Sequence, residues 1–243
     1  MVSRDKILTD INTYLNIAAA PEHNGLQVEG PAHIKKIVFG VSANMALFQA
    51  AAQAKADMVI THHGLIWDNV MPITGIFGRR IAFLIKNNIN LAGYHLPLDM
   101  HPVIGNNALL AKKLGLKNIK PFGEYQGKMI GFRGSFAKPL PVSALAKQLG
   151  GDFIAAGPAK AKNAAIIAGG AHKMIPQAEN AGVDVYITGS RDEFVVEYCK
   201  EAKINFIAMG HYNSEKLGII ALKDYVSKKF KVAAEFIDIP NPF

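Results

Sequence analysis

Cysteine is nearly absent from this chain of 243 residues, since Cys199 is the only one. A disulfide within the chain and a cluster of thiolate metal ligands are therefore excluded. The sequence also lacks a run of about 20 consecutive apolar residues, so we expect no membrane-spanning helix. No long apolar stretch follows the first residues, which argues against a signal peptide. We expect a cytoplasmic protein.

Negative charge is in the minority. The chain has 27 Lys and Arg against 19 Asp and Glu, which gives a formal net charge of +8. A basic balance favours anionic partners such as nucleotides, phosphates or nucleic acid. The lysines are scattered, however, and none forms a dense run between aromatic residues, so solvated helix faces explain them better than a nucleic-acid stripe. A glycine loop of the Walker type, which would hold phosphates, is also missing.

Strand and helix patterns alternate along the chain. Apolar runs predict strands over 37–41, 58–61 and 89–94, and helical spacing predicts helices over 45–55 and 78–88. A Gly- and aromatic-rich segment over 122–136 differs and predicts antiparallel strand pairs. The alternation elsewhere predicts an α/β protein with mainly parallel sheets and right-handed crossovers.

The first half of the chain recurs in the second half. Residues 182–188 resemble 55–61, with an aspartate opening and a threonine closing each run. Residues 203–206 likewise resemble 88–91. We interpret this as an internal duplication, since repeats of this kind determine the fold. The prediction is two similar α/β domains, 1–122 and 123–243, with the C-terminal helix and strand able to pack back on the first.

Two adjacent histidines, His62 and His63, end one predicted strand and are followed by Gly64. In open α/β sheets, ligands bind beyond the carboxyl ends of the strands. Adjacent residues of an extended chain point in opposite directions, but a tight turn at Gly64 would let both imidazoles face one cleft. The alternative is one buried structural histidine and one exposed histidine. We favour metal binding, because buried imidazoles need polar partners.

Two more strand ends carry a histidine followed four residues later by a carboxylate. His95 is followed by Asp99, in a loop that prolines stiffen, and Asp99 is predicted to be a metal ligand. His95 has several open roles: ligand, hydrogen-bond partner of a ligand, proton carrier or satisfied core histidine. His211 is followed by Glu215, which in the first turn of a predicted helix can turn back toward it. Helix capping is the alternative role of Glu215.

The predicted ligands are nitrogen and oxygen donors: His62, His63, Asp99, His211 and Glu215. Such a set suits zinc, iron, manganese, cobalt or nickel without choosing among them. We expect two divalent ions per chain, with Glu215 placed to bridge them. Two ions about 3.5–4 Å apart can activate a water and polarise an ester, amide or phosphoryl group. The other histidines lack this context and are expected at the surface or in loops: His23, His33, His101 and His172.

Four motifs and a closing segment occur together in order. They are Asn24-Gly25-Leu26-Gln27-Val28, Thr61-His62-His63-Gly64, His95-Leu96-Pro97-Leu98-Asp99, Gly210-His211-Tyr212-Asn213-Ser214-Glu215 and Phe236-Ile237-Asp238-Ile239-Pro240-Asn241-Pro242. In this combination they resemble the YbgI-like family of dinuclear-metal, hexameric proteins, often labelled GTP cyclohydrolase I type 2 homologues. The resemblance covers essentially the whole chain.

This resemblance implies two similar α/β domains and a toroidal homohexamer, a trimer of dimers, with metal pairs facing an internal cavity. By motif position it implies the same five metal ligands, with Glu215 as a bridge and His95 near the metals. One departure is Ser190, since many relatives carry glutamate after the preceding Thr-Gly. A hydroxyl cannot replace a carboxylate, so an acid or water-orienting role at this position is not implied here.

Three functions fit these observations. The first is a metal-dependent hydrolase of the GTP cyclohydrolase kind, acting on a nucleotide or other small anionic substrate, with His95 moving a proton. The second is a metal-containing toroid that binds nucleic acid or a partner protein without catalysis. The third is a metal-storage or chaperone role. We rank them in this order, although fold and site alone do not determine function.

Overall fold

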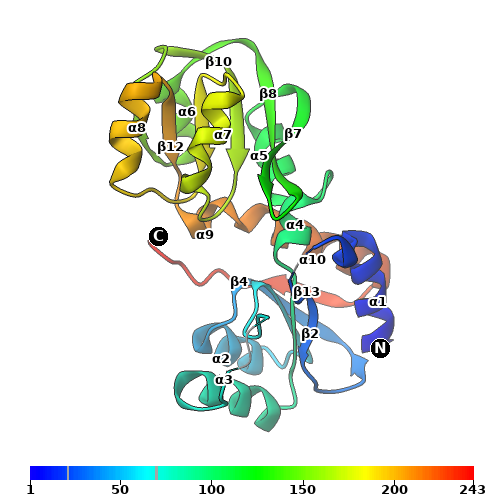
Figure 1. Ribbon diagram of the computed structural model, residues 1–243. Helices are drawn as coiled ribbons and strands as arrows, with labels where there is room; N and C mark the ends of the chain where they lie inside the picture. The colour runs from blue at the N-terminus through cyan, green and yellow to red at the C-terminus, as the bar shows by residue number, and fades with distance from the viewer. Residues whose placement is uncertain (21, 69–70) are drawn as a thin grey trace. The chain divides into compact units, whose positions relative to one another are not determined.

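The computed structural model describes residues 1–20, 22–68 and 71–243 and divides into two compact units (Figure 1). The first unit comprises Met1–Leu98 and Gly218–Pro240, and the second comprises Asp99–Leu217 and Asn241–Phe243. The division therefore falls 24 residues before the boundary expected after residue 122 (122 − 98). The reason is that residues such as Leu110 and Leu114 pack in the second core, and that the antiparallel hairpin over 117–141 belongs to the second sheet. The last helix and strand return to the first unit.

The first unit contains a five-stranded sheet in the order β13-β4-β5-β6-β2. Four of these strands run parallel, and β2 pairs antiparallel with β6 at the edge. Apolar residues fill the strands because both faces of the sheet are covered by helices. The strands are β2 (Gly25–Val28), β4 (Lys36–Ser42), β5 (Met58–His63), β6 (Asn90–Gly93) and β13 (Ala233–Phe236).

Helices pack on this sheet through their apolar residues. Side chains from α2 (Met45–Gln53) and α3 (Gly75–Lys86) form one core with Val38, Val59 and Leu91. The helices α1 (Arg4–Leu15) and α10 (Lys216–Phe230) contact each other, with the rings of Tyr14 and Tyr225 stacked at 4.0 Å. The remaining short elements are the paired strands β1 (Val2–Ser3) and β3 (His33–Ile34) and a 3-10 turn, η1 (Ile17–Ala19).

The second unit contains a six-stranded sheet in the order β7-β8-β10-β11-β12-β9. Only β10-β11 and β11-β12 are parallel pairs, whereas β7-β8, β8-β10 and β12-β9 are antiparallel. The prediction of a mainly parallel sheet is therefore wrong for this unit, because the hairpin over 117–141 extends one edge and β9 closes the other. The strands are β7 (Lys117–Tyr125), β8 (Lys128–Pro141), β9 (Asp152–Ile154), β10 (Lys160–Ile167), β11 (Val185–Thr188) and β12 (Asn205–Ala208).

Helices again cover both faces of the sheet. Leu110 and Leu145, from α5 (Asn106–Lys113) and α6 (Val142–Leu149), pack in one core with Ile166, Ile187 and Ile207 of the strands. The other face holds Tyr186 and Phe206, whose rings lie 5.8 Å apart. The other helices of this unit are α7 (Ile175–Asn180), α8 (Phe194–Ala202), the four-residue α9 (His211–Ser214) and a 3-10 turn, η2 (His172–Met174); α4 (Leu96–Met100) spans the unit boundary.

The two units share one strand pattern. In each, three successive parallel strands are flanked by an antiparallel edge strand that comes earlier in the chain, giving β4-β5-β6-β2 and β10-β11-β12-β9. Two asparagines occupy matching places. The Asn90 Nδ2 donates to the carbonyl oxygens of Pro31 (2.9 Å) and Asp57 (3.0 Å). The Asn205 Nδ2 makes the same pair of bonds, to Pro158 (2.8 Å) and Asp184 (3.0 Å).

None of the helices in the described parts of the chain combines the length and the apolar character that a membrane span requires.

Candidate metal centre

Three imidazoles gather at the carboxyl ends of β5 and β6 in the first unit. The ring centroids of His62 and His63 lie 4.8 Å apart, and that of His95 lies 5.0 and 5.4 Å from them. One nitrogen from each ring lies within 4.8 Å of the other two. The parallel order of β4, β5 and β6 produces this arrangement, because it brings consecutive strand ends to one edge of the sheet.

Hydrogen bonds fix the tautomer of two of these rings. The Nδ1 of His62 lies 2.9 Å from the carbonyl oxygen of Tyr94, which can only accept a hydrogen bond. The Nδ1 of His95 lies 2.9 and 3.0 Å from the carboxylate oxygens of Glu22. Nδ1 therefore carries the proton in both rings, and in the neutral imidazole Nε2 presents a lone pair. This is the usual arrangement of a histidine that ligates a metal.

Tyr94 is itself held in place. Its hydroxyl donates to the Asn12 Oδ1 at 2.9 Å, and its ring is fully buried. Burial raises the pKa of the Tyr94 hydroxyl well above its ordinary value, so it remains a neutral donor. The third ring has a different partner, because the Nδ1 of His63 lies 3.2 Å from the Ser42 Oγ at the end of β4. A hydroxyl can donate or accept, so this contact does not fix the tautomer.

Glu22 and Asn24 support His95, and sequence reasoning missed the role of both. Besides the His95 ring, the Glu22 carboxylate accepts the backbone N–H of Leu96 at 2.8 Å. The Asn24 Oδ1 accepts the backbone N–H of His95, also at 2.8 Å. The only signal in the sequence was the Asn24–Val28 motif, which marked the segment without indicating its contacts.

Gln27 shapes the turn that follows the two adjacent histidines. Its Oε1 accepts the backbone N–H groups of Leu65 (2.7 Å) and Ile66 (3.1 Å), and its Nε2 donates to the Ile66 carbonyl oxygen (2.8 Å). A β-carbon at Gly64 would lie 2.4 Å from the Gln27 side-chain amide. Glycine is therefore required where the chain passes Gln27.

In the second unit, His211 and Glu215 form a pair beyond β12. The His211 Nε2 lies 3.2 Å from the Glu215 Oε1, with the histidine side chain 40% exposed and the glutamate 3% exposed. His211 opens α9, and Glu215 lies at the break between α9 and α10. The expectation of Glu215 in the first turn of one continuous helix is thus wrong. The break still directs its carboxylate back toward the histidine.

Glycine makes room for this pair. Gly169, after β10, has φ +71°, and a β-carbon there would lie 2.3 Å from the Glu215 Oε1 and 3.3 Å from the His211 Nε2. The Ser214 hydroxyl accepts the Gly169 N–H at 2.8 Å and donates to the His211 carbonyl oxygen at 2.7 Å. The loop after β10 and the start of α9 are therefore joined around the pair.

Asp99 lies on the short helix α4, whereas the sequence predicted a loop. Its side chain is buried, and its Oδ1 accepts a hydrogen bond from the Asn106 Nδ2 at 2.8 Å. Asn107 donates to the Ile130 carbonyl oxygen (2.7 Å) and accepts the Ala168 N–H (2.7 Å). An oxygen of Asp99 lies within 4.8 Å of an oxygen of Glu215. Glu215 is therefore the residue that both Asp99 and His211 approach in the second unit.

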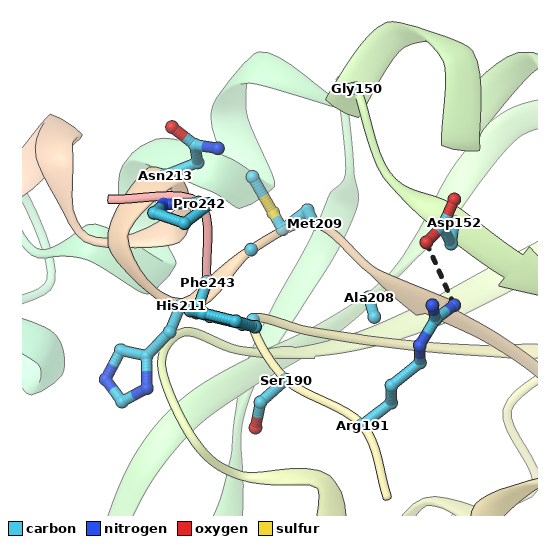
Figure 2. A pocket seen from close by; sticks show the side chains of 12 residues that line it. Gly150, Asp152, Ser190, Arg191, Ala208, Met209, His211, Asn213, Pro242 and Phe243 are labelled. Atoms are coloured by element: carbon cyan, nitrogen blue, oxygen red, sulfur yellow. Dashed lines mark ion pairs between the residues drawn. The ribbon is translucent and has the colours of Figure 1, made fainter. Parts of the chain in front are cut away.

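A cavity of about 510 Å³ opens beside His211 at the ends of β11 and β12. Figure 2 shows Ser190, Arg191 and His211 around it, with Arg191 reaching toward Asp152. The Arg191 guanidinium and the Asp152 carboxylate are 2.9 Å apart. The volume lies within the range of small-molecule sites.

The remaining histidines divide into two groups. His23 and His33 are exposed, as expected, and the His101 Nδ1 accepts the N–H groups of Val103 and Ile104 in a turn. His172 departs from the expectation of an ordinary surface or loop residue, because its Nε2 is buried and its Nδ1 lies 2.9 Å from the Ser190 Oγ.

The donor atoms of both clusters fit a divalent transition metal. The first unit supplies three imidazoles, two of them in the ligating tautomer, and the second supplies one imidazole and two buried carboxylates. Zinc, iron, manganese, cobalt and nickel all accept this mixture of nitrogen and oxygen donors.

The fold and these clusters define a two-unit α/β protein with metal-binding residue types at the carboxyl ends of its strands. The family model described as Duf34/NIF3 (NGG1p interacting factor 3) matches residues 3–242, and the chain belongs to that family. A protein of Archaeoglobus fulgidus named "GTP cyclohydrolase 1 type 2 homolog" is 40% identical over 233 residues, covering 96% of this chain and 94% of its own. One of the same name from Pseudomonas aeruginosa is 39% identical, covering 99% of both chains.

Solved structures agree with the fold. The structure described as protein ybgI, of unknown function, is 38% identical with a TM-score of 0.92, covering 100% of both chains. TTHA1606 from Thermus thermophilus is 30% identical with a TM-score of 0.91, again covering 100% of both. HcgD from Methanocaldococcus jannaschii is 22% identical with a TM-score of 0.87, covering 98% of both, and this likeness shows the fold alone.

Proposed function

We propose that this protein is a dinuclear metal-dependent hydrolase that acts on a nucleotide or another small anionic substrate. The proposed ligands of two divalent ions per chain are His62, His63, Asp99, His211 and Glu215. The observation that carries the proposal is the bond from the His62 Nδ1 to the Tyr94 carbonyl oxygen, which directs the lone pair to Nε2. Buried carboxylates in the other cluster support it, because buried charge needs a counter-ion.

The proposed chemistry assigns separate tasks to the protein groups. When bound, two divalent ions supply Lewis acidity and lower the pKa of a water molecule. His95 transfers a proton through Nε2, since Glu22 holds its Nδ1. Glu22 then stabilises the imidazolium that forms when His95 takes up a proton.

The cavity beside His211 is the proposed substrate site. Arg191 lines it, and the chain carries a net charge of +8, both of which favour an anion. The printed name of the curated relatives, "GTP cyclohydrolase 1 type 2 homolog", makes GTP the first substrate to test.

We also propose that the chain arose by internal duplication and that it assembles as a homohexamer. The shared strand pattern and the matching bonds of Asn90 and Asn205 support an internal duplication. The resemblance to the YbgI-like family supports a toroidal homohexamer, a trimer of dimers, which light scattering of the purified protein would test.

A second candidate function is a metal-containing toroid that binds nucleic acid or a partner protein without catalysis, and the net charge of +8 favours it. The salt dependence of binding and the effect of Asp99→Ala distinguish the two functions. Nucleic-acid binding weakens steeply with salt and survives Asp99→Ala. Hydrolysis is lost in Asp99→Ala while the protein remains folded.

Elemental analysis after metal loading and desalting tests the proposal directly. We expect about two transition-metal ions per chain in the wild type and most of them lost in His62→Ala and Glu215→Ala. His33→Ala, at an exposed histidine, is the matched control and should keep its metal. Wild-type protein that stays metal-free after loading would contradict the proposal. Loaded protein is then assayed for GTP and phosphoester hydrolysis.

A further inference from the structure

Ser190 and His172 form a hydrogen-bonded pair in the second unit that the proposed metal chemistry does not use. The Ser190 Oγ lies 2.9 Å from the His172 Nδ1. The two residues come from separate elements, since Ser190 follows β11 and His172 opens the 3-10 turn η2 after β10. The fold of the second unit therefore brings Ser190 and His172 together.

A carboxylate lies on the far side of the histidine ring. The Asp192 Oδ2 is 3.9 Å from the His172 Nε2, which is within ion-pair reach but longer than a hydrogen bond. Among the described residues the buried Nε2 has no hydrogen-bond partner. The Asp192 side chain is 58% exposed, and its other carboxylate oxygen accepts the Glu193 N–H at 2.7 Å. Such contacts are commonly long before a substrate binds.

The serine side of the pair opens on the cavity described above. Ser190 and Arg191 both line this cavity of about 510 Å³ (Figure 2). A β-carbon at Gly170 would lie 3.8 Å from the Ser190 Oγ and 3.5 Å from the His211 ring, so the hydroxyl and that ring flank one glycine. The cavity therefore offers a hydroxyl backed by an imidazole, beside the Arg191 guanidinium that pairs with Asp152.

We propose that Ser190 is a nucleophile and His172 its general base, and that the cavity takes a carboxylic ester. A nucleophile bonded to a base that a third group orients is the arrangement that activates a serine. This activity uses the same cavity as the proposed metal-dependent function, but it needs no metal ion.

The reaction uses only Ser190, His172, the ester and one water molecule. The Ser190 Oγ bonds to the ester carbonyl carbon, and its proton passes to the His172 Nδ1. The carbon–oxygen bond to the alcohol breaks, and the departing alkoxide takes the proton from His172, which leaves an acyl group on Ser190. Water then adds to that carbonyl and gives its proton to His172. The bond to Ser190 breaks, the Oγ recovers the proton, and the carboxylic acid leaves.

Labelling with diisopropyl fluorophosphate tests the nucleophile on the full chain, with and without a chelator. The reagent bonds to a reactive serine oxygen and releases fluoride and a proton. We expect a single adduct by intact mass, assigned to Ser190 by peptide mapping, and equal labelling in the presence of chelator. Ser190→Ala should lose the adduct and retain the metal content of the wild type. Ser135→Ala is the matched control, because Ser135 bonds to Asn118 and to a backbone carbonyl rather than to a histidine.

The base is tested by His172→Ala, which should slow labelling by about 100-fold, the lower end of general-base catalysis. Loss of labelling in Ser190→Ala could also come from misfolding, so Ser190→Cys is a second test. If the site is intact, the thiol at that position should be acetylated by 4-nitrophenyl acetate. The remaining thiol, Cys199, is buried and its pKa is raised to about 11, so it does not compete. Unlabelled wild type, an adduct at Ser42 beside His63, or an equal rate in His172→Ala would overturn the proposal.

Discussion

The two units place different chemistry on the same strand pattern. After Thr61, which closes β5's apolar run, come two histidines, whereas Thr188 at the matching place is followed by Gly189 and Ser190. The first unit therefore gathers imidazoles. In the second unit, the residue after Thr188 is a glycine, and the carboxylate of Glu215 comes from the break between α9 and α10. The strand order determines where side chains meet, and a few residues after each strand determine what they can do.

The third parallel strand of each unit leads to the same kind of group. After β6 the chain enters the short helix α4, which carries Asp99, and after β12 it enters α9, which Glu215 follows. A histidine precedes each carboxylate by four residues. In the second unit the histidine lies 3.2 Å from its own carboxylate, and in the first unit the His95 ring contacts Glu22.

Gly169→Ala should have the largest effect on the metal ligands and the stability of the second unit. The new β-carbon would lie 2.3 Å from the Glu215 Oε1, at a φ of +71° that alanine rarely adopts. We expect most bound metal to be lost and the free energy of unfolding to fall by about 1–3 kcal/mol. Metal content and urea denaturation measure the two effects.

Gly170→Ala is the matched control for that substitution. Its β-carbon would make ordinary contacts at 3.5–3.8 Å, so metal content and stability should stay near those of the wild type. Equal losses in the two alanine variants would show that Gly169 has no special relation to Glu215.

Glu22→Ala tests the support of the first unit's imidazoles. It removes the acceptor for the His95 Nδ1 and for the Leu96 N–H. We expect metal affinity or turnover to fall by about 10- to 100-fold, the usual effect of removing the partner of a metal-site histidine. Glu22→Gln, which keeps an acceptor oxygen, should recover part of the loss. Glu29→Ala should change neither quantity, because Glu29 is exposed and pairs with Arg4.

Local sequence signals predicted most of the framework. Apolar runs marked β4, β5 and β6, the recurring runs marked β11 and β12, and helical spacing over 45–55 and 78–88 overlaps α2 and α3. Asp99 was expected in a loop stiffened by Pro97 and Pro102. Proline is tolerated in the first turn of a helix, however, and α4 is only five residues long.

Contacts distant in sequence escaped prediction. Glu22 and His95 are 73 residues apart, and His172 and Ser190 are 18 apart. No periodicity joins such pairs, because strand order and loop geometry bring them together. Ser190 could be recognised from sequence only as a departure from the family pattern, and its histidine partner required the structure.

Asn90→Ala and Asn205→Ala measure how alike the two units are. Each asparagine donates to two backbone carbonyls, and each accepts backbone N–H bonds through its side-chain oxygen. Removing the amide leaves buried backbone groups unsatisfied, which costs about 2–4 kcal/mol at such sites. We expect similar losses in urea denaturation. A large loss in one variant and none in the other would show that the shared geometry does not reflect a shared structural role.

The alkylation rate of the single thiol, Cys199, reports local unfolding of the second unit. Cys199 is fully buried on α8 in the second unit, and burial raises the pKa of its thiol to about 11 from an ordinary value near 9.0. A raised pKa means less thiolate at pH 8, so alkylation of the native protein should be slow and should proceed through opening of the second unit. Asn205→Ala should accelerate iodoacetamide labelling by at least about tenfold, since about 1.4 kcal/mol of lost stability corresponds to a tenfold larger open population. Asn90→Ala should leave the labelling rate unchanged if the two units open independently, and an equal acceleration in both variants would show that they unfold as one.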